Sequence, residues 1–197
     1  MKSKKKKSIA RPSVSEIEQE IIRLDDKQRR NRNIKYILSI SAVVVALIII
    51  VTNVWFPVLR VVGTSMNQNI SNGDIIVCFN SHKNIKTGDI IAFYNNGNIL
   101  LKRVVGVSGD VIEMDESGGL IVNGKYVDEP YVISRSYEPC DIEFPVEVEE
   151  DSFFVLGDQR NTSMDSRTEA VGLVKKDSII GKVLIRVWPI DNIDIIK

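Results

Sequence analysis

The sequence predicts a mainly β protein whose β-rich domain is preceded by one N-terminal transmembrane helix. Two observations support this prediction. The stretch from Ile37 to Trp55 carries no charged side chain over about 19 residues, which is the length and composition of a membrane span. The roughly 140 residues after Phe56 consist of short β-branched runs separated by Gly-Asp, Asn-Gly and Gly-Gly pairs. Such a pattern is typical of strands joined by turns.

The first 35 residues are strongly basic. They hold 12 Lys or Arg against 5 Asp or Glu, whereas residues 36–197 hold 14 against 21, so the net charge of zero for the whole chain hides a difference between its ends. We therefore predict that residues 1–35, with the run Lys4 to Lys7, form a basic cytoplasmic tail against anionic lipid headgroups. A helix is the alternative for Val14 to Leu24, where apolar residues recur at spacings of three and four.

Residues 36–56 are predicted to form a transmembrane signal-anchor helix. The basic tail places the N-terminus on the cytoplasmic side, and Tyr36, Trp55 and Phe56 lie where interfacial aromatic residues are common. A buried core helix is the alternative, but such a helix rarely lacks every charge over this length. A cleaved secretory signal is disfavoured, because the basic region and the apolar run are too long and no small-x-small site follows. The expected location is therefore the cell membrane, with a single span and the C-terminal part outside the cytoplasm.

Residues 57–197 are predicted to form the extracytoplasmic domain. Strands are expected at 73–79, 88–94, 99–107, 110–114, 119–127 and 153–158 and within 178–190. Asn123-Gly124 between two apolar runs predicts a two-residue hairpin turn. About residues 111–151 are expected to be a small insertion, since Ser134 to Asp151 is rich in Pro and Glu and poor in strand pattern. No helix is predicted after the anchor.

Composition removes several classes of protein and site. With 44% hydrophobic and 26% charged residues, the chain is neither disordered nor collagen-like. Two Cys and one His are too few for a disulfide framework or the usual structural zinc site, and sequence alone does not show whether Cys78 and Cys140 pair. No phosphate-binding loop is present. No metal, cofactor or nucleic-acid partner is predicted, and His82 is expected to be a loop residue rather than part of a Ser-His-Asp triad.

After these exclusions, the residues that remain allow a serine hydroxyl to act as a nucleophile with a lysine as its base. Ser65 lies in VVGTSM, about ten residues after the anchor, where the preceding Gly-Thr suits a tight turn that exposes a side chain. Lys102 lies among apolar neighbours in ILLKRVVGV. Loss of hydration lowers the pKa of such a lysine from about 10.4 toward the range in which a neutral amine accepts a proton. On pattern alone, the stronger alternative is a strand lysine that reaches solvent and a Ser-Met in an ordinary turn.

Four sequence blocks behind the anchor resemble those of bacterial type I signal peptidases (leader peptidases), of the small single-span Gram-positive kind. The blocks are VVGTSM with NGD, TGDIIAF, LLKRVVGVSGD and FFVLGDQRNTSMDSR, followed by GK and R-x-W-P up to about Pro189. The resemblance implies a signal-peptidase-like catalytic domain with a largely antiparallel β-sheet. It also implies a membrane-bound serine endopeptidase that removes N-terminal signal peptides from secretory precursors with a Ser-Lys dyad.

The resemblance also assigns roles to individual residues. It implies that Ser65 is the nucleophile, that Lys102 is the general base and that the Ser163 hydroxyl orients the lysine amine. The residues expected to support the active site through ion pairs are Arg103, Asp158, Asp165 and Arg167, with Arg103 as the partner of Asp158. The oxyanion is expected to contact the backbone N–H of Ser65. A further hydroxyl, which some relatives carry two residues earlier, is missing because that position is Gly63.

The expected substrates follow from the same resemblance. The family prefers small residues at the first and third positions before the scissile bond, which implies small apolar subsites. Met66, Leu100 and Leu101 are the candidates for lining them, with ordinary core packing as the alternative. The implied partners are secretory precursor proteins and membrane lipids.

Two departures from the family pattern leave a second hypothesis open. Asn67 to Ile70 replace a proline-containing turn, and Gln159 replaces the usual Asn. These changes motivate a non-catalytic or specialised protein on the same scaffold, assisting surface-protein or pilus assembly, although the presence of Ser65 and Lys102 argues against a dead paralogue. A self-cleaving repressor, another kind of Ser-Lys protease, is disfavoured by the membrane span and by the lack of a DNA-binding helix pair.

Overall fold

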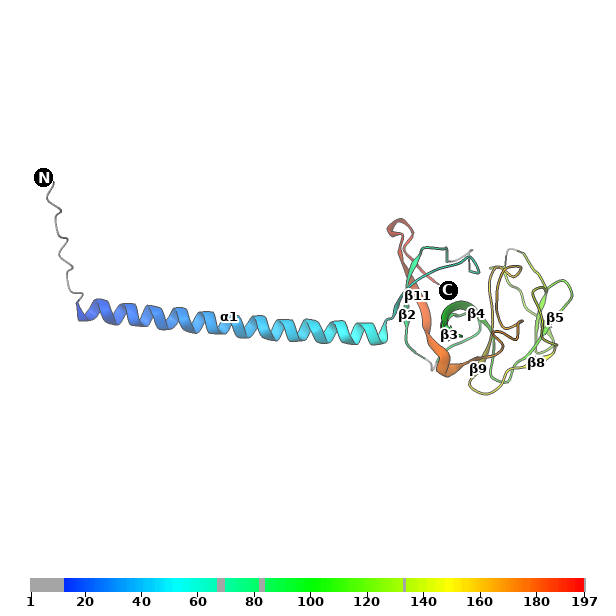
Figure 1. Cartoon of the computed structure of the whole chain (residues 1–197), viewed down its shortest axis with the longest axis horizontal. Helices are drawn as coiled ribbons and strands as arrows, with labels where there is room; N and C mark the ends of the chain where they lie inside the picture. Colours follow the sequence, from blue (N-terminus) through cyan, green and yellow to red (C-terminus); the bar gives the residue numbers. More distant parts are fainter. Residues whose placement is uncertain (1–12, 67–69, 82–83, 133, 197) are drawn as a thin grey trace. The chain divides into compact units, whose positions relative to one another are not determined.

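The computed structural model describes residues 13–66, 70–81, 84–132 and 134–196 (Figure 1). The chain divides after Ile50 into two compact units. The predictions made for Lys4 to Lys7, for residues 67–69 of the altered turn and for His82 fall outside the described residues.

Helix α1, Val14–Trp55, contains 42 residues and is longer than the predicted span. No Gly or Pro interrupts its sequence, and Pro57 follows its end, where the residue before a proline disfavours the helical conformation. The structure therefore has the helix that was the alternative for Val14 to Leu24. Among the described residues, α1 is the one helix long and apolar enough to cross a membrane, and its segment Ile17–Thr52 contains a window of mean hydropathy 2.7.

The larger of two sheets contains eight strands. The order across the sheet is β1 (Val58–Arg60), β2 (Ile75–Phe79), β11 (Ile179–Trp188), β3 (Ile90–Asn95), β4 (Asn98–Val107), β9 (Ser152–Leu156) and β10 (Val174–Lys175), with β12 (Asp194–Ile195) paired to β11. Each of these pairings is antiparallel. The mainly antiparallel β fold is confirmed.

The smaller sheet contains four strands, and short 3-10 turns complete the unit. Its order is β7 (Lys125–Tyr126), β6 (Leu120–Val122), β5 (Val111–Met114) and β8 (Val146–Glu147). Asn123 and Gly124 join β6 to β7 with positive φ angles of 53° and 73°, as a type I′ hairpin turn requires, so that prediction is confirmed. The 3-10 turns are η1 (Lys176–Ser178) and η2 (Ile190–Asn192). The proposal that about residues 111–151 form an insertion remains a prediction.

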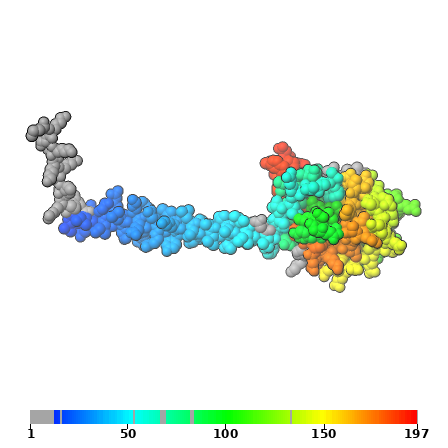
Figure 2. Space-filling view, in the orientation of Figure 1, coloured from blue at the N-terminus to red at the C-terminus, as the bar shows by residue number. Residues whose placement is uncertain are grey.

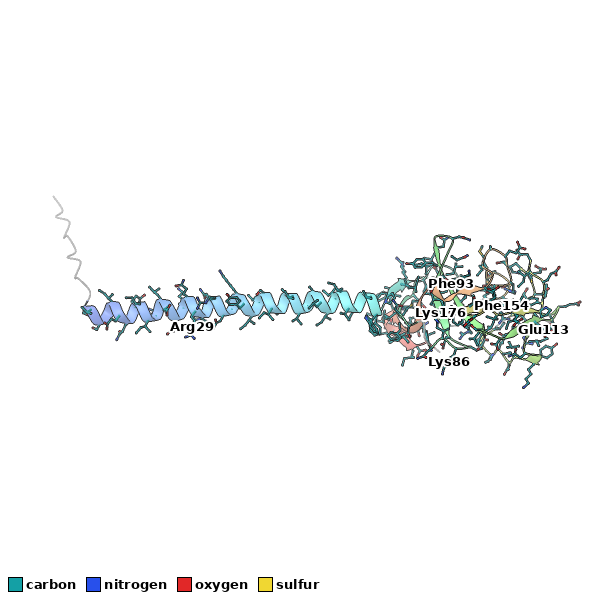
Figure 3. All side chains as sticks on the ribbon, turned by 90° about the horizontal axis from the view of Figure 1, so that it is seen from below. Arg29, Lys86, Phe93, Glu113, Phe154 and Lys176 are labelled. Atoms are coloured by element: carbon teal, nitrogen blue, oxygen red, sulfur yellow. The ribbon has the colours of Figure 1, made fainter. Side chains whose placement is uncertain are left out.

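Strand β3 is buried on both faces and divides the core. Ile90 and Ala92 contribute to one hydrophobic cluster, and Ile91 and Phe93 contribute to a second, as the alternation of side chains along a strand requires. A third cluster contains Phe154 of β9 together with residues of the smaller sheet. Phe93 and Phe154 are both labelled in Figure 3. The hydrophobic core therefore continues through both sheets.

Every segment expected to contain a strand does contain one. The sequence pattern missed β1, β8, β10 and β12, which are only two or three residues long, too short for periodicity to reveal. The turn between β3 and β4 (green in Figure 2) lies at the surface of the β-rich unit, beside the segment around residue 170 (orange). Asn95, the last residue of β3, donates a hydrogen bond of 3.1 Å to the Ala170 carbonyl, which connects the end of β3 to that segment.

Candidate active site

Ser65 lies in the loop between β1 and β2. Gly63 in this loop has a φ of 109°, a conformation that residues with a side chain rarely adopt, so the chain turns sharply just before Ser65. The base of the loop is closed by two hydrogen bonds of 2.9 Å, from the Val61 N–H to the Asp74 carbonyl and from the Gly73 N–H to the Val61 carbonyl. Ser65 is thus presented by a loop fixed to the sheet.

Lys102 comes from the middle of β4, opposite Ile91 of β3. Its side chain is only 3% exposed. Its Nζ donates a hydrogen bond of 2.9 Å to the Oγ of Ser65, which lies 37 residues away in the sequence. The structure therefore brings together the serine and the lysine that the sequence indicated.

Burial controls the proton affinity of this lysine. It lowers the pKa of Lys102 from 10.5 to about 8, because the ammonium loses its hydration. The negative charges of Asp165 and Asp158 act in the opposite direction, and the positive charge of Arg167 lowers the pKa further. A pKa near 8 leaves a useful fraction of neutral amine at weakly alkaline pH, as a general base requires.

Two buried ion pairs lie near the lysine, and they are those expected from the resemblance. Arg103 donates from Nε and Nη2 to the two carboxylate oxygens of Asp158, at 2.9 and 2.8 Å. Arg167 donates in the same two-pronged way to Asp165, at 2.8 and 3.0 Å. Asp165 also accepts a hydrogen bond of 3.0 Å from the Gly157 N–H. The predicted pairing of Arg103 with Asp158 is confirmed, while the roles of these residues in catalysis stay predictions.

Ser163 is fully buried beside the nucleophile's loop. A Cβ on Gly157 would lie 2.1 Å from Ser163 Oγ and 3.0 Å from the Ser65 carbonyl oxygen, so only glycine fits at this position. Within the described residues, Ser163 Oγ has no hydrogen-bond partner. The structure thus places this hydroxyl against the turn that contacts Ser65 but shows no hydrogen bond from it to Lys102, and the lysine-orienting role remains a prediction.

A cleft of about 320 Å³ opens next to Ser65 and Lys102. All three residues proposed for substrate subsites line it, and the full lining is Leu59, Arg60, Val61, Val62, Gly63, Ser65, Met66, Gly97, Asn98, Ile99, Leu100, Leu101 and Lys102. Met66 and Leu101 also belong to a hydrophobic cluster of the core, while Leu100 packs against another. The core-packing alternative therefore also holds for these three, which both support the core and face the cleft.

One edge of β4 borders this cleft. The strand pairs with β3 from Asn98 to Arg103, whereas β9 pairs with its other edge only from Arg103 onward in the part of the chain that the structure describes. The first half of β4 therefore has one edge without a neighbouring strand. Such an edge can bind an extended peptide through backbone hydrogen bonds.

A third buried ion pair lies beside the site, and no motif in the sequence predicted it. Glu129, which lies in the predicted insertion, pairs with Arg160, and neither side chain is exposed. Tyr131 donates a hydrogen bond of 3.0 Å to Glu129 Oε1, and its ring lies 4.2 Å below the Arg103 guanidinium. Arg160 stood inside the block GDQRNTSMDSR without an assigned role, and nothing in the local sequence distinguishes Glu129 from its acidic neighbours.

The remaining candidates for chemistry stay apart from the site. Cys78 and Cys140 are both free thiols, and burial raises the pKa of Cys78 to about 12, so this thiol stays protonated and unreactive. Over residues 13–66, 70–81, 84–132 and 134–196, no cluster of three or more His, Cys, Asp or Glu side chains is arranged to hold a metal ion. The polar groups that the structure brings together at the candidate site are therefore Ser65, Lys102 and the ion pairs near them.

Known proteins resemble this chain over most of its length. A family model described as signal peptidase, peptidase S26, matches residues 33–188. Signal peptidase I P of Bacillus subtilis subsp. natto is 33% identical over 182 residues, which cover 85% of this chain and 97% of the relative. Signal peptidase IB of Staphylococcus aureus (strain COL) is 32% identical over 175 residues, which cover 79% of this chain and 90% of the relative.

Shorter matches also occur. A probable signal peptidase I-2 of Synechocystis sp. is 34% identical over 103 residues, and the chain spans only 44% of the length of that relative. Among solved structures, a signal peptidase I from Enterococcus faecalis V583 is similar with a TM-score of 0.43 and 31% identity, over 52% of this chain and 98% of the other.

Proposed function

The chain belongs to the signal peptidase family, peptidase S26, and is a serine peptidase; from this premise we propose that it is a membrane-bound endopeptidase that removes N-terminal signal peptides with a Ser65–Lys102 dyad. The observation that carries the proposal is the hydrogen bond of 2.9 Å between Lys102 Nζ and Ser65 Oγ, at the edge of an apolar cleft. A nucleophile within hydrogen-bond reach of a buried base is the arrangement that covalent catalysis requires.

The proposed reaction begins with proton transfer. Neutral Lys102 accepts the proton of the Ser65 hydroxyl while Ser65 Oγ attacks the carbonyl carbon of the scissile bond, and the backbone N–H of Ser65 stabilises the resulting oxyanion. The Lys102 ammonium then gives its proton to the leaving amine, and the C–N bond breaks to leave an acyl-enzyme. A water molecule transfers a proton to Lys102 and attacks the ester, which releases the signal peptide and restores both residues.

The cleft supports an extended peptide as the substrate. A precursor segment that adds to the free edge of β4 would place alternate side chains into the cleft. With Met66, Leu100 and Leu101 among its lining, a cleft of about 320 Å³ suits small apolar side chains. Secretory precursors with small residues before the cleavage site are therefore the proposed substrates.

The apolar sequence of α1 supports anchoring in the membrane. At about 1.5 Å per residue, its 42 residues extend roughly 60 Å, about twice the thickness of a hydrocarbon core, so part of α1 would continue into the cytoplasm with the basic tail. The β-rich unit exposes Trp188, Ile190, Ile193 and Ile195 around η2, which suits contact with lipid. We propose a cytoplasmic N-terminus and an extracytoplasmic catalytic domain.

The test is cleavage of a precursor by the purified full-length protein in detergent micelles. The variants Ser65→Ala and Lys102→Ala are expected to lose at least about a thousandfold in kcat/KM, because each removes one half of the dyad. Ser134→Ala and Lys125→Ala, at exposed positions, are the matched controls and should cleave like the native protein. Full activity in either dyad variant would contradict the mechanism.

A labelling experiment separates this function from the non-catalytic alternative. A β-lactam-type probe that acylates serine is expected to modify Ser65 in the native protein and to leave Lys102→Ala unmodified, since the hydroxyl then lacks its base. Peptide mass spectrometry identifies the modified residue. Absence of labelling together with absence of cleavage would favour an assembly role on this scaffold.

A further inference from the structure

Six charged side chains are buried in the segments next to the candidate site. Three are cationic and three are anionic, and they are Arg103, Arg160, Arg167, Glu129, Asp158 and Asp165. They form three ion pairs. Each pair is neutral by itself, so with Lys102 in the neutral form that a general base needs, the buried charges balance as long as all three pairs are intact. Loss of Glu129 alone would leave the charge of Arg160 uncompensated.

Glu129 is connected to the nucleophile through the turn formed by residues 157–160. Glu129 holds the Arg160 guanidinium, and Arg160 Nε donates a hydrogen bond of 3.1 Å to the Gly157 carbonyl. At the same turn, the Gln159 N–H donates a hydrogen bond of 3.0 Å to the Ser65 carbonyl. The turn also carries Asp158, whose charge raises the pKa of Lys102. Glu129 therefore supports a segment that contacts one member of the dyad and acts electrostatically on the other.

Tyr131 provides a second connection from the same segment. Its hydroxyl donates to Glu129, and its ring packs on the guanidinium of Arg103 at 4.2 Å, a favourable cation–π distance. Arg103 in turn neutralises Asp158 and donates a hydrogen bond of 2.7 Å to the Gly88 carbonyl. Two residues of one short segment thus contact two of the buried arginines, since Glu129 pairs with Arg160 and Tyr131 packs on Arg103.

Stability alone is a poor explanation for the Glu129–Arg160 pair. Both side chains are fully buried, and within the described residues Glu129 Oε2 and Arg160 Nη1 have no hydrogen-bond partner. Burying two charges without satisfying all their polar atoms costs free energy that apolar residues of the same size would not. The pair is better explained by an effect on its charged neighbours.

We propose that Glu129 and Tyr131 are positioning residues that set the protonation of Lys102: Glu129 neutralises the buried charge of Arg160 and so holds the turn 157–160, and Tyr131 supports Arg103, the partner of Asp158. The inference rests on the proposed function, because its readout is the activity of the dyad. It assigns a role to a segment that lies outside every sequence block of the catalytic machinery. The charged groups that act on Lys102 are Asp165, Asp158 and Arg167, and Glu129 acts on them through Arg160 and Arg103.

The experiment is the pH dependence of kcat/KM for the full-length protein in detergent, with a fluorogenic peptide that carries Ala at the first and third positions before the scissile bond. The acid limb of this profile is the pH range in which kcat/KM falls because Lys102 becomes protonated. For the native protein its midpoint is expected near pH 8. Glu129→Gln leaves three cations against two anions, which disfavours protonated Lys102, so the limb should move to lower pH by about half a unit. The double variant Glu129→Gln with Arg160→Gln removes one charge of each sign, and its limb should return to the native position.

Tyr131 offers an independent variant with the opposite sign. Tyr131→Leu removes the support of Arg103, so the charge of Asp158 is less compensated and the limb should move to higher pH. Tyr131→Phe retains the ring on Arg103 and is expected to keep the native limb. Glu143→Gln, at an exposed position of the same region, controls for the loss of a carboxylate and should leave the profile unchanged.

The outcomes separate this inference from the proposed function. A folded Glu129→Gln protein with the native acid limb would overturn the inference, and if that variant does not fold, a native limb in Tyr131→Leu would overturn it instead. In either case, cleavage by the native protein and its loss in Ser65→Ala would leave the proposed function intact. Failure of the native protein to cleave would contradict the proposed function itself.

Discussion

The two sides of Lys102 differ in chemistry. On one side lies the cleft, where Arg60 and Lys102 are the charged residues of the lining within the part of the chain that the structure describes. On the other side lie the three ion pairs, buried as deeply as the hydrophobic core. The cleft side offers the lysine almost no opposite charge, whereas the ionic side surrounds it with charges of both signs.

This difference explains how a lysine can serve as a base. Burial alone drives the pKa of Lys102 downward, and the carboxylates of Asp165 and Asp158 limit the fall, so that the pKa lies at about 8. An apolar environment on both sides would lower the pKa further and weaken the base. Unpaired carboxylates would raise it and keep the amine protonated at neutral pH. In the proposed mechanism, the ionic side therefore adjusts the pKa of the base, and the cleft side is the part that would bind the substrate.

The largest change in the free energy of unfolding is expected when one partner of a buried ion pair is removed. Arg103→Met leaves Asp158 buried without its partner, which should destabilise the fold by about 3–5 kcal/mol. Chemical unfolding of the detergent-solubilised protein measures this change. In the double variant Arg103→Met with Asp158→Leu, no buried charge is stranded, and most of the stability should return. A single variant as stable as the native protein would mean that the ionic side does not hold its charges as tightly as its geometry indicates.

A smaller change in the free energy of unfolding, of opposite sign, is expected when Lys102 itself is replaced. Because the folded-state pKa of Lys102 is lowered from 10.5 to about 8, the unfolded chain binds more protons between these values, and the native protein gains stability as pH rises through that window. Below pH 8 the native protein carries the full cost of burying the ammonium. Lys102→Met should therefore be more stable than the native protein at pH 7, by about 2–3 kcal/mol, although inactive.

Unfolding curves at pH 7 and at pH 10 measure this prediction. The advantage of Lys102→Met should shrink at the higher pH, because Lys102 in the folded protein is then largely neutral and no longer carries the cost of a buried ammonium. Lys125→Met, at an exposed position of β7, is the matched control and should show no such dependence. An advantage that is equal at both pH values would indicate better packing of Met rather than removal of a buried charge.

The smallest effect, a change in kcat/KM, is expected from shortening a side chain that lines the cleft. Leu101→Val removes one methylene from the lining, worth about 1 kcal/mol, so kcat/KM for the peptide substrate should change by about fivefold. Its pH profile should keep the native acid limb, because no charge changes. Leu120→Val, in the hydrophobic cluster of the smaller sheet, controls for the loss of a buried methylene and should leave kcat/KM unchanged. A shifted acid limb in Leu101→Val would show that the cleft lining also affects the protonation of Lys102.

Much of the fold was predictable because its signals are local. An uncharged stretch marks α1, and alternation with Gly-Asp or Asn-Gly turns marks β2, β3, β4, β5, β6, β9 and β11. The strands that were missed contain two or three residues. They form because a neighbouring strand offers backbone partners, and this condition leaves no trace in a short sequence.

The site was predictable in part. Ser65, Lys102 and the pairing of Arg103 with Asp158 were expected from sequence blocks, and the structure brings each of these together. The arrangement around Ser163 was not predicted. Its hydroxyl lies against Gly157 and, within the described residues, makes no hydrogen bond to Lys102. The burial of Glu129 could not be predicted, because one acidic residue in a segment rich in Glu gives no local sign of burial.

The sequence by itself determined the long apolar helix and the segments that contain the main strands. Each of these depends on composition or spacing within a short window. Only the tertiary structure decided which charges share one buried environment, since Glu129 and Arg160 are 31 residues apart, Ser65 and Lys102 are 37 apart, and Arg103 and Asp158 are 55 apart. A lysine's pKa depends on the hydration and charge around it in space, so its value near 8 emerges only when the sheet has assembled.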